Sequence, residues 1–209
     1  MLEAYEARTA RLRKNLAEVG LDAAILTDAD SISYFAGYWN YLGIDFGRPT
    51  LLIIPAQSDP LIITPLMESD MCGQMTWIRD IRPWSDGVMD EWRGVLRSGL
   101  ERNPCKRVGI ETRTIPALIA HDLLPILSGT EIATVDMLIA NLRAIKSPDE
   151  IVIMRQAGQV AIAMVEGAKG AIGEGVPEYE VALAVIAAGT RKAASLLDTV
   201  KDRFTSPAI

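Results

Sequence analysis

A helix start at Ser147 divides this chain into two stretches with different patterns. The Ser147 hydroxyl is expected to accept a hydrogen bond from the Glu150 N–H, while the Glu150 carboxylate reaches back to the Ser147 N–H. Pro148 stands at the first helical position, where its missing N–H does no harm. Short apolar runs alternate with helices before this point, and long helices follow it. We therefore expect a boundary here, with domains at 1–145 and 146–209.

The first stretch predicts an α/β domain. Short apolar runs bounded by turn residues predict strands at 23–26, 50–54, 61–64, 76–81, 107–110 and 131–134. Apolar positions at helical spacing predict helices at 3–19, 66–75, 87–102, 116–124 and 135–144, with a helical turn at 33–35 capped by Asp30 or Ser31. The second and third strands are expected to form a hairpin. A hairpin combined with intervening helices favours a mixed β-sheet with flanking helices.

The second stretch predicts helices and little else. Apolar residues follow one helical face from 154 to 168, and Pro177 opens a further helix. Residues 181–188 are apolar on every side, which is typical of a helix that is buried all round. The stretch supplies nothing to bury that helix. We therefore expect these helices to begin a second domain that is incomplete within the 209 residues.

Composition and charge exclude several classes of protein. With 49% hydrophobic and 23% charged residues, the chain is globular rather than disordered. Its net charge of −6 leaves no basic footprint, so we expect no nucleic-acid partner. No apolar run approaches the roughly 20 residues that span a bilayer, and the N-terminus lacks a signal-peptide pattern. Cys72 and Cys105 are interpreted as buried or half-buried thiols. We expect a cytoplasmic protein without a membrane partner.

Few residues could carry catalysis. The one histidine, His121, is interpreted as a polar-face residue, and no His or Cys cluster has metal-site spacing. Asp28 and Asp30 could hold a cation, but turn and cap roles account for them. Glu178 and Glu180 lie in a first helical turn, where the helix dipole accounts for them. The sequence predicts no catalytic residue, no metal ligand and no cofactor within this chain.

One loop is the best candidate for binding. Residues 37–49 hold three glycines, four aromatic rings and Arg48, and such a loop usually packs against something or binds something. The Arg48 guanidinium could pair with a ligand carboxylate through two parallel hydrogen bonds. Phe46, Trp39 or Tyr41 would then cover the rest of the ligand. Alternatively, Arg48 forms a salt bridge within its own fold or lies over the rings.

Four short segments resemble motifs of the creatinase/prolidase-type family, the "pita-bread" hydrolases that include creatinase, Xaa-Pro dipeptidases and Xaa-Pro aminopeptidases. The segments are SISYFAGY (31–38), KRVGIE (106–111), LRAIKSPDEI (142–151) and GVPEYEVA (175–182). Ala36 departs from the Ser or Thr of the family pattern. The four occur in the family's order and spacing. The resemblance implies a creatinase-type N-terminal domain, followed by the first helices of a pita-bread α+β catalytic domain.

The resemblance also implies roles for two residues. Residues 46–48, Phe-Gly-Arg, are similar to a segment of creatinase whose Phe and Arg enter the active site of the other subunit, where the Arg holds the substrate carboxylate. Carried over, Phe46 and Arg48 become substrate-binding residues that contact a small zwitterionic or carboxylate substrate across a homodimer interface. The family's catalytic histidine and acidic metal ligands match no position of this chain. A divalent metal pair is implied for the parent enzyme only if that enzyme is a peptidase.

Three hypotheses follow. In the first, the chain is the N-terminal, substrate-contacting and dimerising part of a C–N hydrolase that resembles creatinase or an Xaa-Pro dipeptidase, and it is inactive alone. In the second, it is a stand-alone module that binds a small carboxylate or dimerises without catalysis. In the third, the domain only scaffolds and dimerises the parent enzyme, and Arg48 is a contact of the fold.

Overall fold

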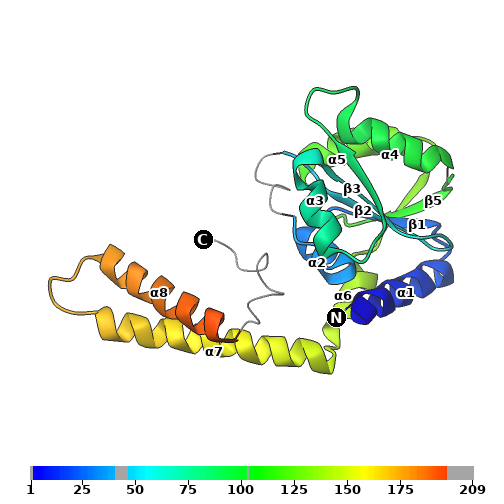
Figure 1. Ribbon diagram of the computed structural model, residues 1–209. Helices are drawn as coiled ribbons and strands as arrows, with labels where there is room; N and C mark the ends of the chain where they lie inside the picture. Colours follow the sequence, from blue (N-terminus) through cyan, green and yellow to red (C-terminus); the bar gives the residue numbers. More distant parts are fainter. Residues whose placement is uncertain (1, 41–46, 103, 197–209) are drawn as a thin grey trace. The chain divides into compact units, whose positions relative to one another are not determined.

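A computed structural model of the chain describes residues 2–40, 47–102 and 104–196 (Figure 1). The chain divides into two compact units, Met1–Ala144 and Ile145–Ile209. Among the described residues, only the first unit contains a β-sheet.

The first unit is built on one six-stranded sheet. Its strands are β1 (Ala23–Leu26), β2 (Leu51–Pro55), β3 (Leu61–Pro65), β4 (Asp80–Trp84), β5 (Arg107–Ile110) and β6 (Glu131–Thr134). They lie in the order β4-β3-β2-β1-β5-β6. β2 pairs antiparallel with both β1 and β3, and the other neighbours are parallel. The predicted hairpin and the predicted mixed sheet are therefore both confirmed.

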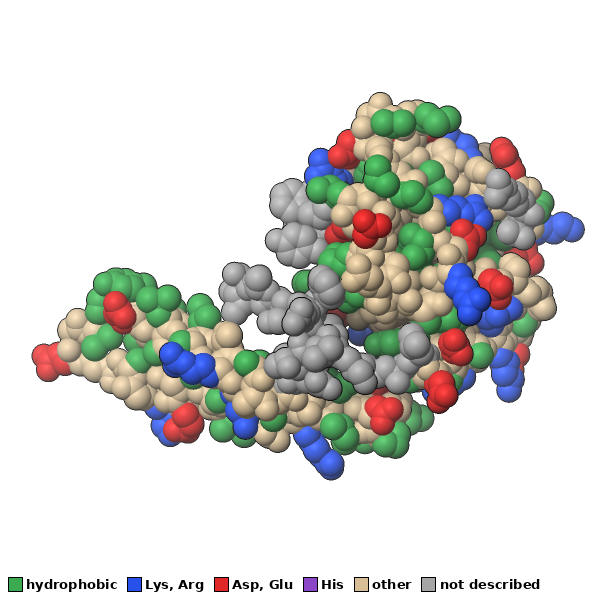
Figure 2. Space-filling model, in the orientation of Figure 1, with side chains coloured by type: hydrophobic (Ala, Val, Ile, Leu, Met, Phe, Trp, Pro, Cys, Tyr) green, Lys and Arg blue, Asp and Glu red, His purple; other side chains and the backbone are tan. Residues whose placement is uncertain are grey.

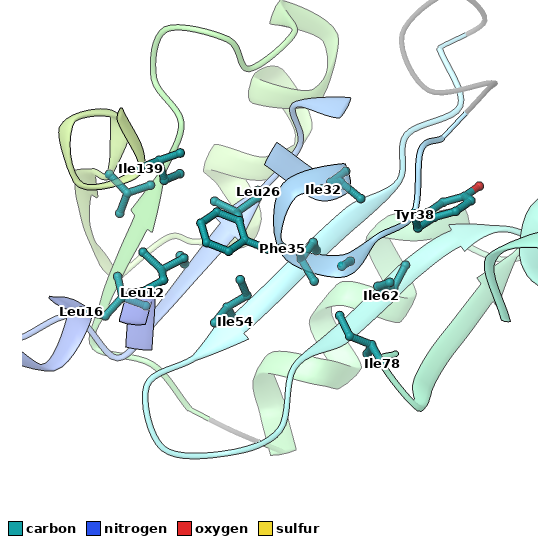
Figure 3. Packing of buried hydrophobic residues seen from close by; sticks show 14 of the residues in the cluster. Leu12, Leu16, Leu26, Ile32, Phe35, Tyr38, Ile54, Ile62, Ile78 and Ile139 are labelled. Carbon is teal, nitrogen blue, oxygen red and sulfur yellow. The ribbon is translucent and has the colours of Figure 1, made fainter. Parts of the chain in front are cut away.

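Helices cover both faces of this sheet. They are α1 (Leu2–Glu18), α2 (Ala29–Ala36), α3 (Leu66–Met75), α4 (Glu91–Arg102), α5 (Ala117–Ile126) and α6 (Asp136–Ala144). One face carries a core cluster that includes Leu12 of α1, Phe35 of α2 and Ile139 of α6 (Figure 3). The other face carries a second cluster with Trp92 of α4 and Leu123 of α5. Because both faces are covered, every residue of β1, β2 and β3 is buried, and these strands show no alternation of apolar and polar residues.

The fourth strand differs from the prediction. It is predicted at 76–81, but β4 begins at Asp80. The Trp77 indole N–H donates to the Phe35 carbonyl at 2.9 Å, so the apolar residues that suggested an earlier strand instead pack as a loop on the first core cluster. β4 lies at the edge of the sheet, where Pro83 is tolerated because it has no second neighbour to pair with.

The cap of α2 also differs. The predicted caps are Asp30 and Ser31, but Asp28 occupies the N-cap position, and its carboxylate accepts the Ser31 N–H at 3.0 Å. The helical turn predicted at 33–35 is part of an eight-residue helix that ends at Gly37 in the left-handed conformation.

α4 starts later and α5 ends later than predicted. Gly87, Met89 and Glu91 all have positive φ, so the segment before Glu91 is a turn and not the first turn of α4. α5 continues past Leu124 because Pro125 lies in its last turn, where the chain can still close a hydrogen bond from the Leu127 N–H to the Leu123 carbonyl.

The second unit is a pair of helices, α7 (Pro148–Ala171) and α8 (Glu178–Leu196). The predicted capping box is present at the start of α7. Ser147 Oγ accepts the Glu150 N–H at 3.2 Å, and the Glu150 carboxylate accepts the Ser147 N–H at 2.7 Å. The helix start that divides the sequence is therefore confirmed.

Small residues allow α7 and α8 to approach each other. A Cβ on Gly167 would lie 2.8 Å from the Ala188 Cβ, and one on Gly189 would lie 2.6 Å from the Met164 Cγ. Nothing in the described part of the chain covers the remaining faces of 181–188. Hydrophobic side chains accordingly reach the surface of this unit (Figure 2), including Ile153, Ile162 and Leu183, which are 55%, 66% and 57% exposed.

Candidate functional site

The strand order brings separate segments of the chain together at one end of the strands. β2 is antiparallel to β3, with Leu51 opposite Ile63, so the residues before β2 lie beside those after β3. β4 is parallel to β3, with Pro65 opposite Trp84, so β4 terminates at the same end of the sheet as β3. Arg48 precedes β2 and therefore meets the segment after β4, although 38 residues separate Arg48 from its partner there.

Two hydrogen bonds hold the backbone that follows Arg48. The buried Trp84 donates its indole N–H to the Pro49 carbonyl at 3.1 Å. The hydroxyls of Thr50 and Thr64 lie 2.9 Å apart and are fully buried. Arg48 thus projects from a segment that the core anchors, which reduces the entropy lost when its side chain binds a partner.

The partner of Arg48 is Asp86. Arg48 Nε donates to Asp86 Oδ1 at 3.1 Å, and Arg48 Nη2 lies 2.7 Å from Asp86 Oδ2. Within the described part of the chain, Arg48 has no other hydrogen-bond or ion-pair partner. The two side chains are 36% and 55% exposed. An exposed pair of this kind contributes only about 0.2–1 kcal/mol to stability.

This geometry bears on the alternative in which Arg48 is only a contact of the fold. That alternative expects an internal carboxylate partner and burial of the pair. Asp86 supplies the partner, but the Arg48 side chain is 36% exposed and therefore not buried. Arg48 is therefore paired and still open to a ligand.

A shallow hollow adjoins the pair. Its volume is about 250 Å³, and its walls come from the ends of β3 and β4 and the residues that follow each of them: Pro65, Leu66, Met67, Trp84, Ser85 and Asp86. Leu66 and Met67 are mostly exposed, so they present an apolar wall to solvent. Small-molecule sites usually enclose about 300–1,000 Å³. The hollow therefore supplies one wall of a site rather than an enclosed pocket.

The predicted site residues differ in what the structure says of them. Phe46 and Tyr41 lie outside the described residues, so the role of Phe46 stays a prediction. Trp39 is 43% exposed. Asp86 was not indicated by the sequence, because its pairing with Arg48 depends on the order β4-β3-β2 and no local pattern reveals that order.

The other titratable candidates have structural roles. His121 is exposed, and its Nδ1 lies 3.0 Å from Asp122 Oδ1, as expected for a polar-face residue. Asp28 caps α2, and Asp30 lies 3.6 Å from the Arg143 guanidinium.

Both cysteines are free. Cys72 is buried and Cys105 is half-buried, as predicted. Burial, together with the charge of Glu68, raises the pKa of the Cys72 thiol to about 12. Cys72 is therefore a packing residue that carries no thiolate near neutral pH.

A buried carboxylate ends the KRVGIE segment. Glu111 is 3% exposed, and its Oε2 accepts the N–H groups of Thr27 and Asp28 at 3.0 and 3.1 Å. Burial raises the pKa of the Glu111 carboxyl, against hydrogen bonds from Ser31, Asp28 and Thr27 that lower it. Glu111 therefore ties the end of β5 to the start of α2 and is not available to a ligand.

Among the described residues, no three or more His, Cys, Asp or Glu side chains gather in a way that could hold a metal ion. No described helix is both long enough and apolar enough to cross a bilayer.

Known proteins resemble this chain in sequence. A family model described as "Creatinase/Prolidase N-terminal domain" matches residues 8–145. Creatinase from Bacillus sp. (strain B-0618) is 26% identical over 178 residues, which cover 84% of this chain and 42% of creatinase. Agropine synthesis cyclase from Rhizobium rhizogenes is 23% identical over 208 residues, which cover 93% and 50%. The chain thus spans about half the length of the curated relatives that it matches.

Solved structures resemble it in fold. Prolidase from Pyrococcus horikoshii OT3 matches 88% of this chain and 48% of its own, with a TM-score of 0.72 and 22% identity. A proline dipeptidase from Streptococcus pneumoniae TIGR4 matches 66% of this chain and 98% of the solved chain, with a TM-score of 0.60 and 20% identity. At these identities the likeness establishes the fold alone.

Proposed function

The chain belongs to the creatinase/prolidase family, and we propose that it forms the N-terminal, substrate-contacting and dimerising part of a C–N hydrolase. Its substrate is a small zwitterion or carboxylate. The observation that carries this proposal is the partly exposed Arg48 side chain, which extends from an anchored backbone and pairs with Asp86 at the rim of an apolar hollow.

The chemistry of Arg48 suits a carboxylate. A guanidinium presents five N–H donors in a planar fork, and Asp86 uses only Nε and Nη2. The side of the guanidinium formed by Nη1 and Nη2 can donate two parallel hydrogen bonds to a second carboxylate. The apolar side chains of Leu66 and Met67 can then cover the uncharged part of the same ligand.

The open shape of the hollow suits a site shared between polypeptides. It is smaller than an ordinary ligand pocket and lacks an opposite wall among the described residues. In the proposed homodimer, the catalytic half of the partner subunit supplies that wall. Phe46 reaches the same substrate in this proposal.

The catalytic groups belong elsewhere in this proposal. The chain matches about half of its curated relatives, and residues 1–209 are expected to hold neither the catalytic histidine nor metal ligands. A divalent metal pair of the kind that peptidase members use would be held by the other half. This chain alone is therefore expected to be inactive. Its free cysteines suit a reducing compartment, and we place the protein in the cytoplasm.

Steady-state kinetics of the full-length protein test the role of Arg48. Creatine and Gly-Pro are the two substrates, and Arg48→Ala is compared with wild type. Loss of a charge-assisted hydrogen bond should weaken substrate binding by about 1.5–3 kcal/mol. Arg97→Ala is the control, because Arg97 is also exposed and paired, but with Asp90 rather than at this edge. Equal KM and kcat for Arg48→Ala and wild type would refute the role.

A second candidate function is a stand-alone module that binds a small carboxylate without turning it over. The accessible Arg48 and the exposed apolar faces of α7 and α8 favour it equally. Calorimetry of the 209-residue chain with creatine and Gly-Pro separates the two. Heat of binding that Arg48→Ala removes supports the module, whereas no heat with either ligand counts against a complete site in this chain.

A further inference from the structure

We propose that Asp86 sets the charge selectivity of the Arg48 site, so that the site favours a ligand carrying a cationic group together with its carboxylate and disfavours a simple carboxylate. The inference rests on the proposed function, because it needs the ligand carboxylate to bind Arg48. It adds Asp86 as a second recognition residue, which the strand order places beside Arg48.

The geometry places a fixed negative charge against the ligand carboxylate. Asp86 holds Arg48 through Nε and Nη2, at 3.1 and 2.7 Å. A ligand carboxylate on the remaining edge therefore shares one guanidinium with Asp86. The two carboxylates repel each other, and a single Arg48 cannot neutralise both.

The same geometry leaves room for a compensating cation. The Asp86 side chain is 55% exposed, so its outer surface is accessible. Asp86 also lines the hollow, whose other walls include the apolar Leu66 and Met67. A ligand that lies in the hollow with its carboxylate on Arg48 brings its other end close to Asp86.

The backbone holds Asp86 in place independently of Arg48. The Gly87 N–H, one residue further on, donates to Glu91 Oε1 at 3.0 Å. Glu91 Oε2 in turn accepts from Arg93 Nη2 at 3.0 Å, and Arg93 also bonds Asp90 at 3.1 Å. Glu91 and Asp90 are thus paired with arginines of α4, Arg93 and Arg97. Asp86 pairs instead with Arg48.

Coulomb's law sets the size of the effect. Two unit charges about 6 Å apart in a water-like medium change an affinity by about threefold. Asp86 is expected to weaken a simple carboxylate by about that factor and to strengthen a nearby cationic group by about the same factor. Both ligands carry the carboxylate, so its repulsion by Asp86 cancels when their affinities are compared. Removal of the Asp86 charge should therefore change the ratio of the two affinities by about threefold.

Calorimetry of the full-length protein with matched ligand pairs tests this. Creatine is paired with N-acetylsarcosine, in which a neutral acetyl group replaces the cationic amidino group. Gly-Pro is paired with N-acetyl-Gly-Pro, which lacks the ammonium charge. The variants are Asp86→Asn, which keeps the shape of the side chain, and Asp80→Asn as the control. Asp80 opens β4 and pairs with Arg82, so this control removes the same charge at the opposite end of the strand that leads to Asp86.

Wild type should prefer the zwitterion of the pair that it binds, and Asp86→Asn should reduce that preference about threefold while Asp80→Asn leaves it unchanged. An unchanged preference in Asp86→Asn, or equal weakening of both ligands, would overturn the inference and leave Arg48 as the carboxylate site. If wild type binds neither pair in a manner that depends on Arg48, the proposed function fails, and this inference fails with it.

Discussion

The Tyr34 hydroxyl donates a hydrogen bond to the Leu142 carbonyl at 3.2 Å, across 108 residues of sequence. Tyr34 belongs to the SISYFAGY segment and Leu142 opens the LRAIKSPDEI segment, so two of the motifs that carry the family resemblance touch each other. Arg143 also lies over the Tyr34 ring, 5.8 Å from its centre. These motif residues therefore hold α2 against α6, so the contacts behind this part of the family resemblance stabilise the fold.

Tyr34→Phe removes that hydrogen bond and keeps the ring. We expect a loss of about 1 kcal/mol in the free energy of unfolding, the usual net value of such a bond. Urea denaturation followed by circular dichroism measures it. Tyr179→Phe on α8 is the control, since Tyr179 is 62% exposed and should lose almost nothing. Equal midpoints for the two variants would contradict the expectation.

Gly109→Ala should destabilise the first unit. Its new Cβ would overlap Val135 Cγ1 and lie 3.2 Å from Leu21 Cδ1, in β5 between β1 and β6. Overpacking of a core typically costs about 1–3 kcal/mol. Thermal denaturation should show a lower Tm. The control is Gly73→Ala in α3, where the nearest atom is Ile81 Cδ1 at an ordinary 3.7 Å, and a Tm at or above wild type is expected there.

Glu111→Gln should change how stability depends on pH. Burial raises the folded-state pKa of Glu111 above its ordinary 4.5. The folded chain therefore binds this proton more tightly than the unfolded chain, and the contribution of Glu111 to stability falls as the pH rises from 4.5 through the folded-state pKa. Urea denaturation from pH 4.5 to 7 should show a slope in wild type that the glutamine variant reduces. Identical slopes would disprove the assignment.

Asp22→Asn supplies the opposite sign as a control. The Arg107 and Lys106 N–H groups lower the pKa of Asp22 below its ordinary 3.8. Stability from this carboxylate is complete above pH 3.8 and is lost as the pH falls through the lowered pKa. Replacing Asp22 should therefore leave the slope between pH 4.5 and 7 as it is in wild type.

Ser147→Ala should loosen the start of α7. The Ser147 hydroxyl satisfies the Glu150 N–H, and a lost N-cap typically costs about 1 kcal/mol. Amide hydrogen exchange in the first turn of α7 should become about fivefold faster. Ser195→Ala, at the far end of α8, should leave these amides unaffected, because within the described residues the Ser195 hydroxyl bonds the Lys192 carbonyl of its own helix. Unchanged exchange in Ser147→Ala would mean that other contacts fix this helix end.

Much of the fold could be predicted because its signals are local. The hairpin of β2 and β3 is predicted by two apolar runs and the turn between them. The start of α7 is predicted by the four consecutive residues Ser147 to Glu150. Errors occurred where tertiary contacts outweighed local pattern. Trp77 is apolar and looks like a strand residue, but its indole bonds Phe35 in another element. Asp28 caps α2 although it lies outside the predicted turn.

The candidate site was less predictable for the same reason. Arg48 stands out because a cation beside aromatic residues and glycine is locally unusual. Asp86 has no such signal, and only the sheet order places it within 2.7 Å of Arg48. In the sequence, Leu66 and Met67 have the pattern of ordinary helix residues. Only the pairing of β3 with β4 places these mostly exposed side chains beside Asp86.

The parallel pairing of β1 with β5 has a consequence during synthesis. β1 leaves the ribosome early, yet the Thr27 N–H at its end bonds Glu111, 84 residues later. Until β5 has emerged from the ribosome, the nascent chain has the β2–β3 hairpin on one side of β1 and an unpaired strand edge on the other. Such an edge can pair with another chain. At about 5–20 residues per second the exposure lasts several seconds, the interval in which a chaperone would protect this polypeptide.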